Sequence, residues 1–171
     1  MRSSSDQVLD RLDSGMRDLV ARQDMAFIAT SDSGGECDAR FRAGAPGFIH
    51  VLDERTLAYP EYRVTGRPGR PGRPGRPSEN PHIGILLIDI GRDLLGLHVN
   101  GTARIVDDAT LRDYVGDLPA GGADAGDAVD GRRPERWVVV SVREAYVQPR
   151  APVESYARAR PWAKAKTASG S

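Results

Sequence analysis

Residues 95–106, LGLHVNGTARIV, alternate between apolar and polar side chains. The apolar or small set comprises Leu95, Leu97, Val99, Gly101, Ala103 and Ile105. The polar set comprises His98, Asn100, Thr102 and Arg104. Successive side chains of a β-strand point to opposite faces of its sheet. The pattern therefore predicts a long strand with one face in a core and the other toward solvent or a ligand.

Other segments of the chain predict strands that follow one another through short turns. They are residues 25–32 (MAFIATSD), 37–44 (CDARFRAG), 48–52 (FIHVL), 56–62 (TLAYPEY), 82–90 (HIGILLIDI) and 135–148 (ERWVVVSVREAYVQ). The turn signal SGGE, at 33–36, separates the first two, and DER, at 53–55, joins the third to the fourth as a hairpin. Strands connected in this way form an antiparallel sheet, and six or seven of them usually close into a small barrel.

Two amphipathic helices are expected to flank this sheet. Over residues 5–20, apolar side chains recur at spacings of three and four residues, with Ser5 or Asp6 available as the cap. The stripe comprises Val8, Leu12, Met16, Leu19 and Val20. Residues 107–115, DDATLRDYV, predict a second, shorter helix. Because strands and helices do not alternate, the chain is expected to be mainly β, with flanking helices, rather than a Rossmann-type fold.

The composition bounds the class of protein. A length of 171 residues fits one domain. Lys+Arg and Asp+Glu both number 24, so no overall field draws the chain to nucleic acid or a membrane. The first ten residues lack the apolar core of a signal peptide, and no run is long enough to span a bilayer. Cys37 is the single cysteine, which forbids an internal disulfide, and no metal-ligand spacing is visible. We therefore expect a cytoplasmic protein without a membrane partner.

Three stretches carry a further signal through their order along the chain. They are residues 27–63 (FIATSDSGGECDARFRAGAPGFIHVLDERTLAYPEYR), 78–89 (SENPHIGILLID) and 95–106. With the leading helix, this ordered set resembles the pyridoxamine 5′-phosphate oxidase-like flavin-binding split barrels. The resemblance covers roughly residues 10–146, which is most of the foldable chain. It implies an antiparallel split β-barrel of six to seven strands.

The resemblance also implies a homodimer that binds flavin mononucleotide (FMN) in a groove between its subunits. The positions that match the family's cofactor site are Arg42, His50, Tyr59, Tyr62, Arg63, His98 and Asn100. The first two would contact the phosphate, the next three would form the cofactor wall, and the last two would face the ring. These residue types suit the task, because a phosphate needs convergent N–H donors and a flavin ring needs an apolar or aromatic wall with a few polar groups.

Each of these positions also has a structural interpretation. Arg42 can be a solvated strand residue. Tyr59 and Tyr62, on either side of a proline, can pack the end of the barrel. His50 lies between two apolar residues and can be a histidine whose nitrogens are satisfied within the fold. No catalytic residue is assigned.

The segment between the second hairpin and SENP departs from the family. Four Gly-Arg-Pro triplets occupy residues 66–77, where the family normally has a helix. Proline at every third position prevents a helix, so residues 64–77 are expected to be an irregular, exposed insertion. Three explanations of the repeat are possible: a DNA-binding arginine hook, a collagen-like helix, and a degenerate replacement of the family helix. We favour the third and then the first, and nucleic acid is not an expected partner.

The remaining segments complete the domain organisation. Residues 1–148 are expected to form the barrel domain, with a mobile Gly/Ala/Asp-rich loop at 116–134, and 149–171 a disordered basic tail. That tail lacks the arginine- and histidine-bearing motif of the true oxidases, so oxidation of pyridoxamine phosphate itself is not expected. The resemblance implies a flavin-dependent oxidoreductase that transfers a hydride to or from a small molecule. The alternatives are a non-catalytic carrier or scaffold for a flavin, a deazaflavin or no cofactor, and a nucleic-acid-associated protein.

Overall fold

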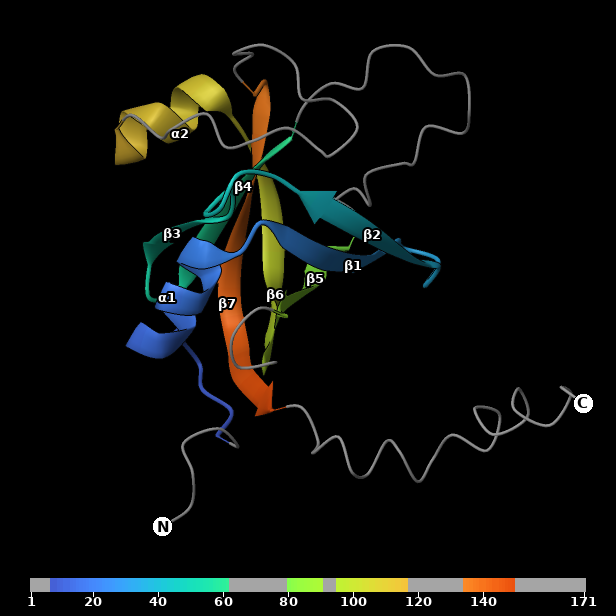
Figure 1. Cartoon of the computed structure of the whole chain (residues 1–171). Helices are drawn as coiled ribbons and strands as arrows, with labels where there is room; N and C mark the ends of the chain where they lie inside the picture. The colour runs from blue at the N-terminus through green and yellow to red at the C-terminus, as the bar shows by residue number, and fades with distance from the viewer. Residues whose placement is uncertain (1–6, 62–79, 91–94, 117–133, 150–171) are drawn as a thin grey trace, which may run out of the picture.

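The computed structural model describes residues 7–61, 80–90, 95–116 and 134–149, which form two helices and seven strands (Figure 1). The helices are α1 (Ser14–Arg22) and α2 (Asp108–Val115). The strands are β1 (Met25–Ser31), β2 (Cys37–Ala43), β3 (His50–Asp53), β4 (Thr56–Glu61), β5 (His82–Asp89), β6 (Leu95–Asp107) and β7 (Arg136–Pro149). The predicted Gly-Arg-Pro insertion lies outside the described residues, as do residues 117–133 of the predicted loop and 150–171 of the predicted tail.

The seven strands form one antiparallel sheet in the order β2-β1-β5-β6-β7-β4-β3. This confirms the predicted mainly β fold with flanking helices. The edge strands β2 and β3 do not pair with each other, so the sheet does not close. The sheet is nevertheless curled. Four strands separate β2 from β4 in the sheet, yet Arg42 of β2 lies 3.7 Å from Glu61 of β4. The fold is therefore a barrel with a split.

Strand β6 has the alternation that its sequence predicts. Its buried positions include Leu97, Val99, Gly101 and Ala103. Asn100 is exposed and His98 is half-buried on the opposite face. The register with β7 shifts at a β-bulge between Asn100 and Gly101. A Cβ atom at Gly101 would collide with the main-chain carbonyl oxygen of Ser141, so the close approach of the two strands at this bulge requires glycine.

The N-terminal helix is shorter than predicted. It begins at residue 14 and has Asp13 as its N-cap, whose side chain accepts a hydrogen bond of 2.8 Å from a main-chain N–H of the first turn. The predicted helix over residues 5–20 is wrong at residues 7–13, which are not helical, whereas the predicted caps Ser5 and Asp6 lie outside the described residues. The main chain of Leu9 pairs in both directions with Ala145 of β7, which holds this segment extended. The predicted stripe is buried at Leu12, Met16, Leu19 and Val20, whereas Val8 is exposed.

Two hydrophobic cores hold the fold together. The larger core fills the inside of the split barrel and includes the buried side chains of α1, which packs on β3 (Figure 1). The smaller core lies between α2 and the outer face of β4, β6 and β7 and contains Ala58, Val106, Leu111, Trp137 and Val139. Asp108 fixes α2 in place, because its carboxylate accepts hydrogen bonds from the Trp137 indole at 2.7 Å and from Arg112 at 2.8 Å. Neither described helix is long and apolar enough to cross a membrane.

Candidate functional site

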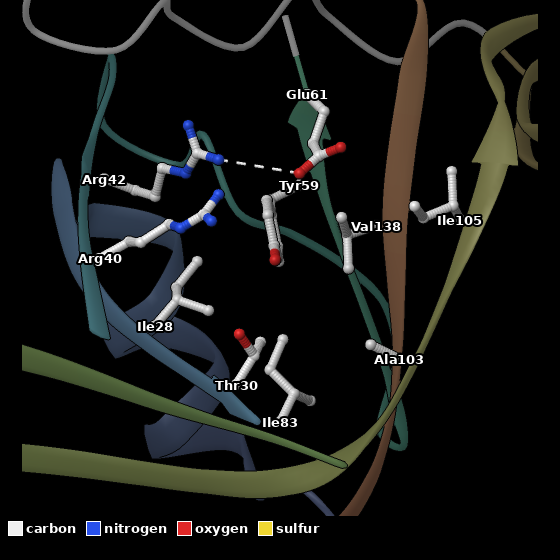
Figure 2. A pocket seen from close by; sticks show the side chains of 10 residues that line it. All are labelled: Ile28, Thr30, Arg40, Arg42, Tyr59, Glu61, Ile83, Ala103, Ile105 and Val138. Atoms are coloured by element: carbon white, nitrogen blue, oxygen red, sulfur yellow. Dashed lines mark ion pairs between the residues drawn. The ribbon is translucent and has the colours of Figure 1, made fainter. Parts of the chain in front are cut away.

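A cavity lined by charged and apolar side chains lies inside the barrel at its split. It is lined by Ile28, Thr30, Arg40, Arg42, Tyr59, Glu61, Ile83, Ala103, Ile105 and Val138 (Figure 2). The arginines extend from edge strand β2 toward Tyr59 and Glu61 on β4, so the cavity spans the split (Figure 2). Its volume is about 30 Å³, which is enough for roughly one water molecule. We call it the barrel cavity.

Both arginines of the barrel cavity form ion pairs. Arg42 Nη2 lies 3.7 Å from Glu61 Oε1, and Arg40 Nε lies 2.6 Å from Asp38 Oδ2. The side chain of Arg42 is only 19% exposed, so Arg42 is not the solvated strand residue of the structural interpretation. Arg40 was not among the predicted site residues, although its position two residues before Arg42 places both side chains on one face of the strand.

Tyr59 occupies the centre of the barrel cavity. Its ring is buried, and its hydroxyl points away from the two guanidinium groups toward Ile28 and Thr30 (Figure 2). Burial raises the pKa of this hydroxyl well above its ordinary value. The Glu61 carboxylate raises the pKa further, whereas the positive charges of Arg42 and Arg40 oppose the rise. Tyr59 is therefore a neutral phenol that packs this end of the barrel and can donate one hydrogen bond.

The outer face of the sheet carries a row of side chains across five strands. Register partners place Phe41 of β2, Phe27 of β1, Leu86 of β5, His98 of β6 and Tyr146 of β7 side by side. Phe27 and Phe41 are 43% and 51% exposed as whole residues, and the centroids of their rings lie 5.5 Å apart. His98 stacks on Tyr146 with ring centroids 4.7 Å apart and an interplanar angle of 6°. We call this set the outer row.

A groove of about 440 Å³ runs beside the outer row on the same face. Its lining includes Ala29, Ser31, Cys37, His82, Gly84, Asn100, Arg143 and Glu144. The floor of the groove consists of small residues, because Ala29 of β1 pairs in register with Gly84 of β5. Gly84 in turn pairs with Asn100 of β6. The Asn100 amide contacts the Glu144 carboxylate at 3.5 Å. We call this space the outer groove. Of its polar residues, only Asn100 was among the predicted site residues.

The SENP motif has a structural role at the end of the outer groove. The Asn80 amide nitrogen donates to Ser31 Oγ at 2.8 Å, and its amide oxygen accepts a hydrogen bond from the main-chain N–H of His82 at 3.1 Å. These bonds join the start of β5 to the end of β1. Asn80 therefore fixes the position at which β5 begins.

His50 lies apart from both places. Its ring packs edge-on against Trp137 with centroids 5.4 Å apart, and its Nε2 atom is buried without a hydrogen-bond partner among the described residues. Burial lowers the pKa of the imidazole below its ordinary value. The interpretation of His50 as a histidine with satisfied nitrogens is therefore wrong for Nε2.

The structure thus divides the predicted site residues into separate groups. Arg42 and Tyr59 meet in the barrel cavity. His98 and Asn100 share the outer face, where alternation along the strands points them away from the core. His50 packs on Trp137, and Tyr62 and Arg63 lie outside the described residues.

A curled antiparallel sheet whose edge strands do not pair with each other defines a split-barrel protein. The family model described as pyridoxamine 5′-phosphate oxidase matches residues 12–148, and the chain belongs to that family. HupZ of Group A Streptococcus has a similar structure, with a TM-score of 0.54 and 21% identity over 82% of this chain and 99% of that one. A conserved protein of unknown function from Corynebacterium diphtheriae gives a TM-score of 0.51 and 13% identity over 85% and 100% of the two chains. These likenesses concern the fold, and no curated protein matches the chain.

Proposed function

We propose that the protein is a homodimeric flavoprotein that binds FMN and transfers a hydride to or from a small molecule. The observation that carries the proposal is the division of polar residues between the two faces of the sheet. One face provides the guanidinium groups of Arg40 and Arg42, and the other provides a groove with His98 and Asn100. Membership in the pyridoxamine 5′-phosphate oxidase family supports the choice of a flavin.

The size of each cavity decides where the flavin ring would bind. The barrel cavity has about 30 Å³ and cannot admit a tricyclic ring. The outer groove has about 440 Å³, within the usual range for ligand pockets of about 300–1,000 Å³. Its floor of small residues and its amide and carboxylate rim fit a flat ring with polar edges. The residues therefore fit a flavin whose ring lies on the outer face of the sheet.

A single protomer does not bring the ring position and the arginines to the same face. Arg42 points to the core face of the sheet and His98 to its outer face. A two-fold dimer resolves this separation, because the arginines of one protomer can meet the outer groove of the other. The outer row supplies the apolar surface for such a contact, since Phe27 and Phe41 leave about half of their rings exposed.

Each group of residues has a distinct task in this site. Guanidinium forks bind phosphate oxygens through paired N–H groups, which suits Arg40 and Arg42. Asn100 offers both a donor and an acceptor to the edge of the ring, and the outer row excludes water from it. When bound, the flavin supplies the hydride chemistry, and the protein contributes binding, orientation and electrostatics.

A non-catalytic carrier or scaffold is the second candidate. The observation that favours it is the pairing of Arg42 and Arg40 with carboxylates, because a paired guanidinium binds phosphate less readily. A deazaflavin would fit the outer groove by the same criteria of size and polarity. The nucleic-acid alternative depends on the arginine repeat, which lies outside the described residues.

The visible absorption spectrum of purified protein tests the proposal. Bound oxidised flavin gives a visible band, and release by heat followed by chromatography identifies the chromophore. Protein purified without a chromophore is titrated with FMN, riboflavin and a deazaflavin, using the fluorescence of each ligand. Saturable binding of FMN at one site per protomer supports the proposal. No binding of any of the three would contradict it. Oxidation of a nicotinamide donor by the loaded protein separates the oxidoreductase from the carrier.

A further inference from the structure

The Glu61 carboxylate lies beside the Arg42 guanidinium at the barrel cavity. The closest atoms of the two side chains are 3.7 Å apart, and both point into the barrel cavity (Figure 2). Their side chains are only 14% and 19% exposed, so water screens the pair weakly. A phosphate and a carboxylate use the same N–H groups of a guanidinium. Because 3.7 Å is longer than a charge-assisted hydrogen bond, Glu61 acts on a phosphate near Arg42 through its negative charge.

The carboxylates beside the two arginines weaken the attraction of the barrel cavity for a phosphate. Arg40 pairs with the half-exposed Asp38, and Arg42 lies beside Glu61, which itself lines the cavity. The negative charge of Glu61 also reaches Tyr59, whose hydroxyl pKa it helps to raise. A phosphate dianion beside Arg42 would thus meet the repulsion of Glu61 as well as the attraction of the arginines.

The geometry of the barrel cavity limits how the Glu61 side chain could move to admit a phosphate beside Arg42. The barrel cavity has room for about one water molecule, which is too little for a phosphate group beside the carboxylate. Glu61 is the last residue of β4 and pairs in register with Arg136 of β7, which fixes its main chain. Rotation of the Glu61 or the Arg42 side chain can open the position next to Arg42, and either rotation breaks their ion pair, a cost that an uncharged side chain at position 61 does not carry.

We propose that Glu61 is a specificity-determining residue, which lowers the affinity of the Arg42 position for a phosphate monoester and so shifts the site toward the unphosphorylated form of its ligand. The choice of a flavin as that ligand rests on the proposed function. The effect of the Glu61 charge on a phosphate rests only on the barrel cavity. FMN and riboflavin form the matched pair of ligands, because they share the ring and differ in the phosphate.

The experiment compares wild type with Glu61→Gln, which keeps the shape of the side chain and removes its charge. Glu61→Ser serves as a second variant if the glutamine variant does not fold. Glu54→Gln is the control, because Glu54 is also a carboxylate beside an arginine but lies exposed in the turn between β3 and β4. Dissociation constants for FMN and riboflavin are measured for each variant. The rise in melting temperature caused by inorganic phosphate is measured in parallel.

We expect Glu61→Gln to tighten FMN binding by roughly 10- to 100-fold and to leave riboflavin binding within about twofold of wild type. Glu54→Gln should leave both constants unchanged. Equal factors for FMN and riboflavin in Glu61→Gln, or no change in either, would overturn the proposal. If no variant binds a flavin, the proposed function is wrong and inorganic phosphate alone tests Glu61. A larger phosphate-induced stabilisation in Glu61→Gln than in wild type then supports the proposal, and equal stabilisation overturns it.

Discussion

Arg42 and His98 project from opposite faces of one sheet. Arg42 pairs in register with Ala26, which is buried in the core, whereas His98 pairs with Leu86, the partner of the half-exposed Phe27. Neither residue could change sides without a shift of register, which would move a whole set of apolar side chains out of the core. In the proposed shared site, a ligand that contacts both residues draws them from two different chains.

Loss of the polar side chains on the outer face should weaken flavin binding without unfolding the protein. In the double variant His98→Leu/Asn100→Leu, we expect flavin affinity to fall by at least about tenfold, because the rim of the outer groove loses its hydrogen bonds. Stability should change by less than about 1 kcal/mol, since the lost contacts are the Tyr146 stack and one long hydrogen bond. Arg104→Leu, at an exposed position of the same strand, is the control. Collapse of stability with unchanged affinity per folded molecule would show that the pair is structural.

Charges in the outer row should separate the proposed dimer. Phe27→Lys and Phe41→Lys each place an ammonium group in a surface that would be desolvated on association, so we expect a monomer. Light scattering at micromolar concentration measures the mass of each variant beside wild type. Tyr114→Lys is the control, because Tyr114 is an equally large side chain that is 86% exposed on α2. A monomeric wild type would remove both the dimer and the shared site.

Gly101 should tolerate no side chain. Gly101→Ala brings a Cβ atom against the Ser141 carbonyl, and relief requires movement of two paired strands. We expect a loss of about 3 kcal/mol in the free energy of unfolding, or no folding. Gly96→Ala on the same strand is the control, because its Cβ would meet its nearest atom at an ordinary 3.6 Å. Urea denaturation measures both variants, and equal stabilities would contradict this account of the bulge.

His50 should make stability depend on pH. Burial lowers its pKa in the folded state, so the unfolded chain takes up the proton first as pH falls. The contribution of neutral His50 is complete above its ordinary value of about 6.5 and is lost progressively below it. His50→Phe keeps a ring against Trp137 and should show a smaller decrease in the free energy of unfolding between about pH 7 and pH 5. Parallel pH profiles for the two proteins would exclude His50 as the cause.

The local sequence pattern predicted the strands of the sheet. It did not predict the start of α1 or the Arg42–Glu61 ion pair, because both depend on contacts between residues far apart in the sequence. The period of two in β6 placed His98 and Asn100 on the outer face, as observed. The start of α1 was missed because Leu9 pairs with Ala145, a residue far away in sequence. The Arg42–Glu61 ion pair could not be predicted from the sequence either. It forms because the sheet curls and brings β2 opposite β4.

A mixed dimer tests the shared site most directly. One chain carries Arg42→Gln/Glu61→Gln, which removes the arginine without leaving its partner's charge unpaired, and the other carries His98→Leu/Asn100→Leu. Co-expression with two different tags and purification through both gives only mixed dimers. Each should contain one intact site and one site lacking both groups, so we predict about one flavin per mixed dimer, compared with about two for wild type and almost none for either parent. Mixed dimers that bind no more flavin than their parents would contradict a site shared between two protomers.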